Sequence, residues 1–231
     1  VSRLATDRQR TEDQYAVELR DIVDIYGVSI GEIEGSIISS VVPSLTSGIK
    51  RAVKRLTRTE PLCIGPGMKT GLNIKLNDPS TLGADAVAAI ELFDCPCIIF
   101  DIGTATTISV LDADASMLGG VIIPGPGIAL EALTARSALL SSVSLEAPKH
   151  VIGSNTADCM RSGSVYGTAS MMDGMCDRIE EELGKKCSIV ATGGLGKEIV
   201  PHCRRNIVYC DNLLLEGLRL LYEKNAGKAG R

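Results

Sequence analysis

The amino-acid sequence predicts an α/β fold made of two α/β halves. Segments rich in apolar and β-branched residues, such as 97–100 and 187–191, alternate with segments that repeat an apolar residue every three or four positions, such as 14–26. The first pattern is typical of buried strands, and the second is typical of helices that cover them. The chain of 231 residues is long enough for one large domain or two small ones. We place the boundary near residue 94, which gives domains 1–94 and 95–231.

The individual elements follow from the same patterns. Pro43 closes a β-branched run and is well placed to start the helix that follows it. In the first half we expect helices at 14–26, 43–56 and 84–93, and strands at 37–42, 61–64 and 71–76. In the second half we expect strands at 97–100, 105–111, 117–123, 187–191 and 207–209, and helices at 128–140, 156–183 and 212–223.

Composition and charge argue against several classes of protein. Hydrophobic residues make up 45% of the chain, charged residues 23%, and the net charge is −4. Because long runs of lysine and arginine are lacking, we expect neither a nucleic-acid groove nor a polybasic membrane anchor. The apolar stretches are too short to span a bilayer. The eight cysteines form no C-x-x-C pair, and the two histidines lack metal-ligand spacing to them, so we expect free thiols in a reducing cytoplasm rather than a zinc site.

The most informative motif is 98–107, in which a buried strand carries Asp101 to its end. Gly103 lets the backbone turn tightly and approach a ligand, and Thr104, Thr106 and Thr107 offer hydroxyls and N–H groups suited to phosphate. A carboxylate repels phosphate unless a cation lies between them, so the motif indicates a metal or monovalent ion. An ordinary Asp-x-Gly turn would contain the same residues.

Three further motifs each allow a functional and a structural interpretation. Gly193-Gly194 follows a strand and either lets a flat ligand such as adenine lie on the backbone or forms a plain turn. Gly83-Ala84-Asp85 opens a helix, where Asp85 is either a general base or a carboxylate that pairs with the free N–H groups of the first turn. Thr156 is either a ligand contact or part of a helix cap.

The order and spacing of the motifs resemble the type III pantothenate kinase family over nearly the whole chain. The matching segments are Ser39–Pro43, Gly83–Asp85, Asp101–Thr107, Gly119–Gly125, Gly153–Thr156, Thr192–Gly194 and Asp211–Gly217. The resemblance implies two ribonuclease-H-like halves of the acetate-and-sugar-kinase/chaperone/actin superfamily, which bind ATP between them. It implies transfer of the γ-phosphate of ATP to pantothenate, giving 4′-phosphopantothenate in the first step of coenzyme A biosynthesis. It further implies a cytoplasmic homodimer, with pantothenate bound close to the subunit interface.

The resemblance also implies a role for each matching residue. Asp85 matches the catalytic base. Asp101 matches the ligand of an activating monovalent cation, K⁺ or NH₄⁺, which acts beside the Mg²⁺ that accompanies ATP. The residues that match substrate-binding positions are Gly83, Ala84, Asp85 and Thr156. The residues that match ATP-binding positions are Gly103, Thr104, Gly193 and Gly194.

Three features depart from the family pattern. The first strand and its Asp-x-Gly-Asn-Thr phosphate loop are missing, Ala86 replaces an arginine, and Leu76 replaces a frequent tyrosine. Asp85 and Asp101 are also a few positions closer than in the family. We therefore expect a biological chain heavier than 24.4 kDa, with a segment before Val1 and further residues between Asp85 and Ala86. Two alternatives follow from the same departures: a kinase for another small alcohol, and a non-catalytic regulatory relative of the family.

Overall fold

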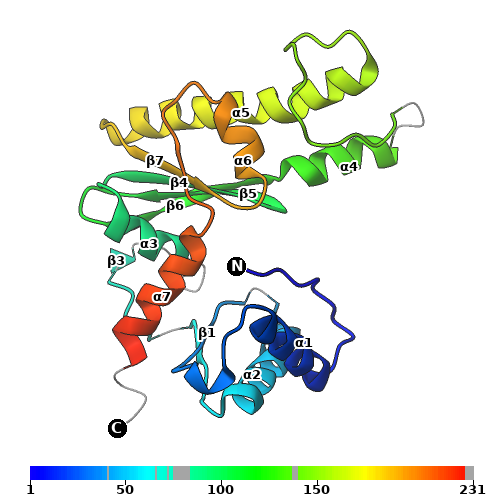
Figure 1. The fold of residues 1–231 in the computed structure, drawn as a ribbon. Helices are drawn as coiled ribbons and strands as arrows, with labels where there is room; N and C mark the ends of the chain where they lie inside the picture. Colours follow the sequence, from blue (N-terminus) through cyan, green and yellow to red (C-terminus); the bar gives the residue numbers. More distant parts are fainter. Residues whose placement is uncertain (41, 66, 72, 75–83, 137–139, 227–231) are drawn as a thin grey trace. The chain divides into compact units, whose positions relative to one another are not determined.

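The computed structural model describes residues 1–231 except 41, 66, 72, 75–83, 137–139 and 227–231 (Figure 1). The chain divides into two compact units, one formed by residues 1–70 and 218–231 and the other by residues 71–217. This division falls after Thr70, whereas the sequence placed a boundary near residue 94. Helix α3 (Ala84–Leu92) belongs to the second unit because it packs against strand β4 (Cys97–Ile102).

The first unit is built on two helices, α1 (Glu12–Ile25) and α2 (Pro43–Thr57). Thr11 starts α1 with a capping box: its side chain accepts a hydrogen bond from the N–H of Gln14, and the Gln14 side chain accepts one from the N–H of Thr11. Pro43 stands at the first position of α2, where its missing N–H has no intrahelical partner to lose.

A small core joins the two helices of the first unit. Tyr15 of α1 packs with Leu45 and Ala52 of α2, and all three are buried. The other elements of this unit are the 3₁₀ helix η1 (Ile30–Glu32), the parallel strands β1 (Ile37–Ile38) and β2 (Leu62–Cys63), and the greater part of α7 (Leu213–Ala226).

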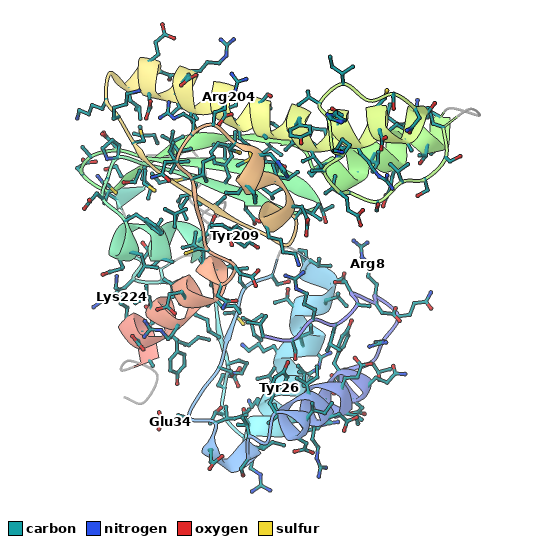
Figure 2. All side chains as sticks on the ribbon, turned by 45° about the horizontal axis from the view of Figure 1, so that its top comes forward. Arg8, Tyr26, Glu34, Arg204, Tyr209 and Lys224 are labelled. Atoms are coloured by element: carbon teal, nitrogen blue, oxygen red, sulfur yellow. The ribbon has the colours of Figure 1, made fainter. Side chains whose placement is uncertain are left out.

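The second unit is built around a sheet with the strand order β3-β6-β5-β4-β7-β8. Its strands other than β4 are β3 (Asn73–Ile74), β5 (Ala105–Leu111), β6 (Ser116–Pro124), β7 (Ser188–Thr192) and β8 (Val208–Tyr209). Strands β4, β5 and β6 form an antiparallel meander, and β7 and β8 continue the sheet parallel to β4. From β6 to β8 this is the strand order of a ribonuclease-H-like half. Strand β8 carries Tyr209 (Figure 2).

Helices cover both faces of this sheet (Figure 1). Helix α5 (Thr156–Leu183) lies along one face, where Phe100 of β4 and Val165 of α5 are fully buried. On the other face, Ile99 of β4 packs in one cluster with Ala88 of α3. Because side chains alternate along a strand, Asp101 lies on the α3 face. Further helices among the described residues of the unit are α4 (Pro126–Arg136), α6 (Gly196–Ile199) and η3 (Val200–His202).

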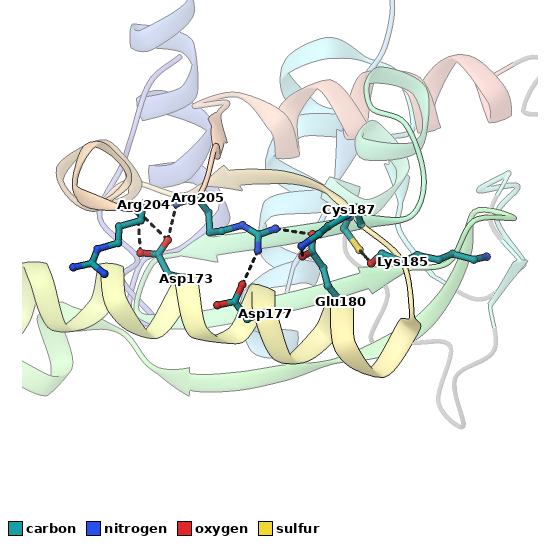
Figure 3. A network of polar contacts seen from close by, with 8 residues as sticks. Asp173, Asp177, Glu180, Lys185, Cys187, Arg204 and Arg205 are labelled. Atoms are coloured by element: carbon teal, nitrogen blue, oxygen red, sulfur yellow. Dashed lines mark hydrogen bonds and ion pairs between the residues drawn. The ribbon is translucent and has the colours of Figure 1, made fainter.

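Glu180 near the end of α5 ties this helix to the segments that enter β7 and β8. Its carboxylate accepts hydrogen bonds from the side chains of Arg205 (2.6 Å) and Lys186 (2.7 Å) and from the N–H of Cys187 (3.0 Å) (Figure 3). Burial acts to raise the pKa of Glu180, but these donors outweigh it and lower the pKa to about 2. Asp173, one turn of helix earlier than Asp177, accepts hydrogen bonds from the N–H groups of residues 204 and 205.

The α/β prediction is confirmed, and the predicted helices and strands occur in the expected order where the structure describes them. Some of the predicted bounds are wrong, since the strand expected at 37–42 is confined to Ile37–Ile38 where the structure describes it. Strand β4 does not end at Phe100 but continues through Ile102, because the ladders pair Asp101 with Thr107 and Thr192. The short helix α6 was not predicted, since four residues are too few to show a helical period. The described part of the chain has no helix long and apolar enough to cross a membrane.

The prediction of further residues between Asp85 and Ala86 stays a prediction, which an intact-mass measurement of the biological chain tests. Helix α3 runs without a break from Ala84 through both residues, and the N–H of Ala86 donates to the Asp85 carboxylate. Ala84, Asp85 and Ala86 are all buried.

Candidate active site

Asp101 lies at the centre of three adjacent strands, one residue before the end of β4. The ladders place Thr107 of β5 on one side of it and Thr192 of β7 on the other. Directly paired residues point to the same face of a sheet, so the two hydroxyl side chains flank the carboxylate. Burial raises the pKa of Asp101. The result is a row of oxygen-bearing side chains near the end of the sheet.

Asp85 lies over the same face, in the first turn of α3. Only 8% of its surface is exposed. Burial raises the pKa of Asp85, and the nearby charge of Asp101 raises it further, while hydrogen bonds from the backbone N–H groups of Asp85 and Ala86 act to lower it. The structure therefore brings together the two carboxylates that the sequence predicted as site residues.

A close-fitting glycine places the loop after β7 against Asp101. Gly193 has φ +90°, and a Cβ at this position would lie 2.5 Å from Oδ1 of Asp101 and 2.5 Å from the carbonyl oxygen of Ile102. Only glycine allows this approach without a shift of the backbone. The N–H of Leu195 then donates to the carbonyl oxygen of Ile102 at 3.1 Å, which holds the loop on the end of β4.

A second glycine joins the β4–β5 turn to the end of β6. A Cβ on Gly125 would lie 2.2 Å from the carbonyl oxygen of Gly103 and 2.5 Å from that of Thr104. The N–H of Gly125 donates to the carbonyl oxygen of Thr104 at 3.1 Å. The turns that contain Gly103, Thr104 and Gly193 therefore gather at the same end of the sheet as Asp101, as expected for a ligand site built from loops.

The remaining predicted site residues divide into three cases. Ala84 is buried beside Asp85. The start of α7 packs closely on Ala84, since a Cβ on Gly217 would lie 1.7 Å from the carbonyl oxygen of Ala84. Thr156 lies elsewhere in the unit, in a groove between α4 and α5. Gly83 and Leu76 lie outside the described residues.

The groove that contains Thr156 has a volume of about 590 Å³ and a mostly apolar lining. Its wall on α4 includes Ala129 and Leu133, and its wall on α5 includes Cys159 and Met160. Leu133 is 51% exposed, and Ile128 on the same helix is 44% exposed. An apolar groove with such residues is a candidate for a protein interface.

Sequence reasoning gave no role to two residues of this site, Thr192 and Tyr209, and it did not predict that Thr107 lies beside Asp101. Thr192 and Thr107 belong to matching motifs, but only the strand pairing shows that they flank Asp101. Tyr209 was assigned to a strand without a role, and its hydroxyl lies 3.0 Å from the carbonyl oxygen of Gly193. Among the described residues, no three His, Cys, Asp or Glu side chains form a group that could hold a metal ion.

Comparison with known proteins agrees with this architecture. The family model described as type III pantothenate kinase matches residues 1–178. The type III pantothenate kinase of Halalkalibacterium halodurans is 43% identical over 227 residues, covering 96% of this chain and 89% of the relative. That of Bacillus cytotoxicus is 40% identical over 228 residues, covering 97% and 87%.

Solved structures with low sequence identity share the fold. A Baf family protein from Campylobacter jejuni has a TM-score of 0.57 at 19% identity, covering 89% of each chain. The activator of the 2-hydroxyisocaproyl-CoA dehydratase from Clostridium difficile, solved with bound ADPNP, has a TM-score of 0.50 at 12% identity, covering 92% of this chain and 82% of the other.

The mixed sheet, with a buried carboxylate and glycine-containing loops at one end, defines an α/β protein with a ribonuclease-H-like half and a candidate ligand site at the end of its sheet. The sequence comparisons identify the family more narrowly. The chain belongs to the type III pantothenate kinase family.

Proposed function

We propose that the protein catalyses the ATP-dependent phosphorylation of pantothenate to 4′-phosphopantothenate, in the cytoplasm, as the first step of coenzyme A biosynthesis. Membership of the family supports this activity, and one observation supports placing the chemistry at Asp85. Asp85 is buried at the start of α3 beside Asp101, and burial and the charge of Asp101 both raise its pKa. A buried carboxylate of this kind is suited to accept a proton from a substrate hydroxyl.

In the proposed reaction, Asp85 is the general base. The terminal hydroxyl of pantothenate attacks the γ-phosphorus of ATP, the bond between this phosphorus and the bridging oxygen breaks, ADP leaves, and the hydroxyl proton moves to Asp85. Phosphoryl transfer needs little covalent chemistry from the protein, so positioning and charge stabilisation supply most of the catalysis. The start of α3 holds the Asp85 carboxylate in a fixed position, because Ala84, Asp85 and Ala86 are all buried.

The loops at the end of the sheet are proposed to bind the nucleotide. Gly193 and Gly194 would contact the adenosine part of ATP, and Gly103 and Thr104 would contact its phosphates. The close approach of Gly193 to Asp101 supports this assignment, because it shows that the two loops meet at one point. The Mg²⁺ that accompanies ATP would be held mainly by the phosphates, as is usual for this ion.

Asp101 is proposed to hold a monovalent cation, K⁺ or NH₄⁺. The residues present fit such an ion: Asp101 and Asp85 are like charges in a mostly buried place, and hydroxyl side chains flank Asp101 on both sides. Oxygen atoms are the ligands that hard cations prefer. The ion would supply positive charge between the carboxylates and the phosphates of ATP.

Pantothenate is proposed to bind at Gly83, Ala84, Asp85 and Thr156, in a homodimer. The apolar groove between α4 and α5 supports the dimer, because it leaves Leu133 half exposed in one chain. Thr156 lines this groove, so a second copy seated there would lie next to it. This placement agrees with a pantothenate site close to the subunit interface.

The test is a coupled assay for ADP release by the purified protein with ATP, Mg²⁺, potassium and pantothenate. ADP release that depends on pantothenate, with the phosphorylated product identified by mass spectrometry, is the expected result. Release only with another small alcohol would instead assign a different acceptor. ATP binding without turnover on any alcohol would contradict the proposal and favour a regulatory protein.

A further inference from the structure

Tyr209 at the end of β8 contacts the loop that follows β7. Its hydroxyl lies 3.0 Å from the carbonyl oxygen of Gly193 and 3.1 Å from Oδ1 of Asp211. The β7–β8 ladder pairs Tyr209 with Ala191, two residues before Gly193. The N–H of Cys210 donates to the carbonyl oxygen of Ala191 at 2.8 Å and extends this pairing. The phenol is therefore held in place by the sheet, and its hydroxyl lies at the loop.

The ring of Tyr209 also fits against Gly196 at the start of α6. A Cβ on Gly196 would lie 2.6 Å from Cε2 of the ring, so only a glycine lets the ring lie flush with the backbone. The N–H of Gly196 donates to the carbonyl oxygen of Gly193 at 3.0 Å. This carbonyl therefore has two donors within reach, one from the backbone and one from the phenol, and a carbonyl oxygen can accept both.

The held carbonyl belongs to the residue that touches Asp101. The conformation of Gly193, with φ +90°, would bring a Cβ within 2.5 Å of Oδ1 of Asp101, so little free space separates the two residues. A rotation of the peptide after Gly193 would move the N–H of Gly194 and the surface offered to a ligand. Contacts thus run without interruption from the Tyr209 hydroxyl through Gly193 to Asp101.

We propose that Tyr209 is a positioning residue for the nucleotide: its hydroxyl fixes the carbonyl of Gly193 and so preorganises the loop on which ATP lies. This inference rests on the proposed function, in which Gly193 and Gly194 bind ATP. Fixing the loop before binding lowers the entropy cost of ordering it with the ligand. Because the contacts lead to this loop, loss of the Tyr209 hydroxyl weakens the binding of ATP more than the binding of pantothenate.

The test is Tyr209→Phe, which removes the hydroxyl and keeps the ring against Gly196. The KM for ATP is expected to rise roughly threefold to tenfold, the range for loss of one hydrogen bond. The KM for pantothenate and kcat are expected to stay within about twofold of the parent protein. Gly196→Ala, which pushes the ring away, is expected to raise the KM for ATP as well. ATP binding measured by calorimetry checks that the change lies in affinity.

Tyr166→Phe is the matched control, because the hydroxyl of Tyr166 donates to the carbonyl oxygen of Pro148 at 3.2 Å, also in a partly buried place. It should leave the KM for ATP unchanged. If Tyr209→Phe raises the KM for ATP and the KM for pantothenate equally, or only lowers the melting temperature, Tyr209 is merely structural and the inference is overturned.

Gly193→Ala separates this inference from the proposed function. If Gly193→Ala weakens ATP binding and Tyr209→Phe does not, the role of Tyr209 is overturned, while the assignment of Gly193 to the ATP site is supported. If Gly193→Ala leaves ATP binding unchanged, the proposed nucleotide loop is itself wrong.

Discussion

Asp85 and Asp101 lie close enough for the charge of Asp101 to raise the pKa of Asp85, although they come from different elements. Helix α3 brings the first carboxylate over the end of β4, which carries the second. Two like charges in a buried place are unfavourable unless one of them is protonated or a cation lies nearby. This pair therefore links the base, the cation and the pH dependence of the proposed reaction.

Asp85→Asn is expected to lower kcat by about 10²-fold or more, the scale for loss of a positioned base. Asparagine has nearly the same shape, so the binding of ATP should change little. Steady-state kinetics and calorimetry measure the two quantities. Asp94→Asn, an exposed carboxylate after the same helix, is the control and should be neutral. A kcat within about twofold of the parent would leave Asp85 only its part in capping α3.

The pH profile should report the raised pKa of Asp85. A general base is active when deprotonated, so kcat/KM should fall as the pH drops through this pKa, at a pH above the ordinary range of aspartate. Asp101→Asn removes the like charge that contributes to the shift. The acidic limb measured on the residual activity should then move to lower pH. The profiles are compared without potassium or ammonium, because a cation at Asp101 would cancel its charge. A limb that stays in place there would show that Asp101 does not influence Asp85.

The same shift predicts that Asp85→Asn makes the protein more stable at neutral pH. A carboxyl with a folded-state pKa above its unfolded-state value binds more protons when folded, so stability falls as the pH rises through that window. Asparagine carries no charge and avoids this loss. The melting temperature of Asp85→Asn should therefore exceed that of the parent at pH 7, and the two should converge in acid below the ordinary pKa of aspartate. A variant that is less stable than the parent at pH 7 would contradict the burial argument.

Local sequence was enough to predict the parts of the site that a single segment builds. Asp101 follows a buried apolar strand and precedes Gly103, and this pattern is visible in a few residues. The contact of Gly193 with Asp101 depends on the parallel pairing of β4 with β7, which joins segments far apart in the chain. The position of Tyr209 needs a further strand pair. Such contacts follow from strand order, which residue patterns do not specify.

Potassium dependence tests the role proposed for Asp101. The rate in potassium or ammonium chloride should exceed the rate in sodium chloride several-fold at constant ionic strength, because the proposed ion at Asp101 is K⁺ or NH₄⁺. Asp101→Ala should abolish most of the activity and the difference between the salts. Initial rates of ADP release measure both effects. Equal rates of the parent protein in the three salts would count against the cation site.

Leu133→Glu tests the proposed homodimer. Leu133 lines the groove between α4 and α5 and is half exposed, so a charge there would have to be desolvated when a second copy covers it. Light scattering at micromolar concentration should show a dimer for the parent and a monomer for the variant. Ile25→Glu, at an exposed apolar residue of α1, should remain dimeric. A parent protein that is monomeric under these conditions would overturn the dimer.

Glu180→Gln should destabilise the second unit without affecting the proposed chemistry. The carboxylate is 5% exposed and accepts charged hydrogen bonds from Arg205 and Lys186. Removing its charge leaves Arg205 less well paired, which should cost about 1–3 kcal/mol of unfolding free energy at pH 7. Denaturant unfolding measures this cost. Asp177→Asn, which removes a 68% exposed partner of Arg205, should cost clearly less, because exposed ion pairs contribute little.

The pH dependence of this cost has the opposite sign to that of Asp85. The pKa of Glu180 is lowered from 4.5 to about 2, so the folded state binds fewer protons than the unfolded state between these values. Its contribution to stability is complete above about pH 4.5 and is lost as the pH falls through about 2. The difference in unfolding free energy between the parent and Glu180→Gln should therefore shrink over this window. A constant difference down to pH 2 would show that packing, and not the charge of Glu180, ties α5 to the sheet.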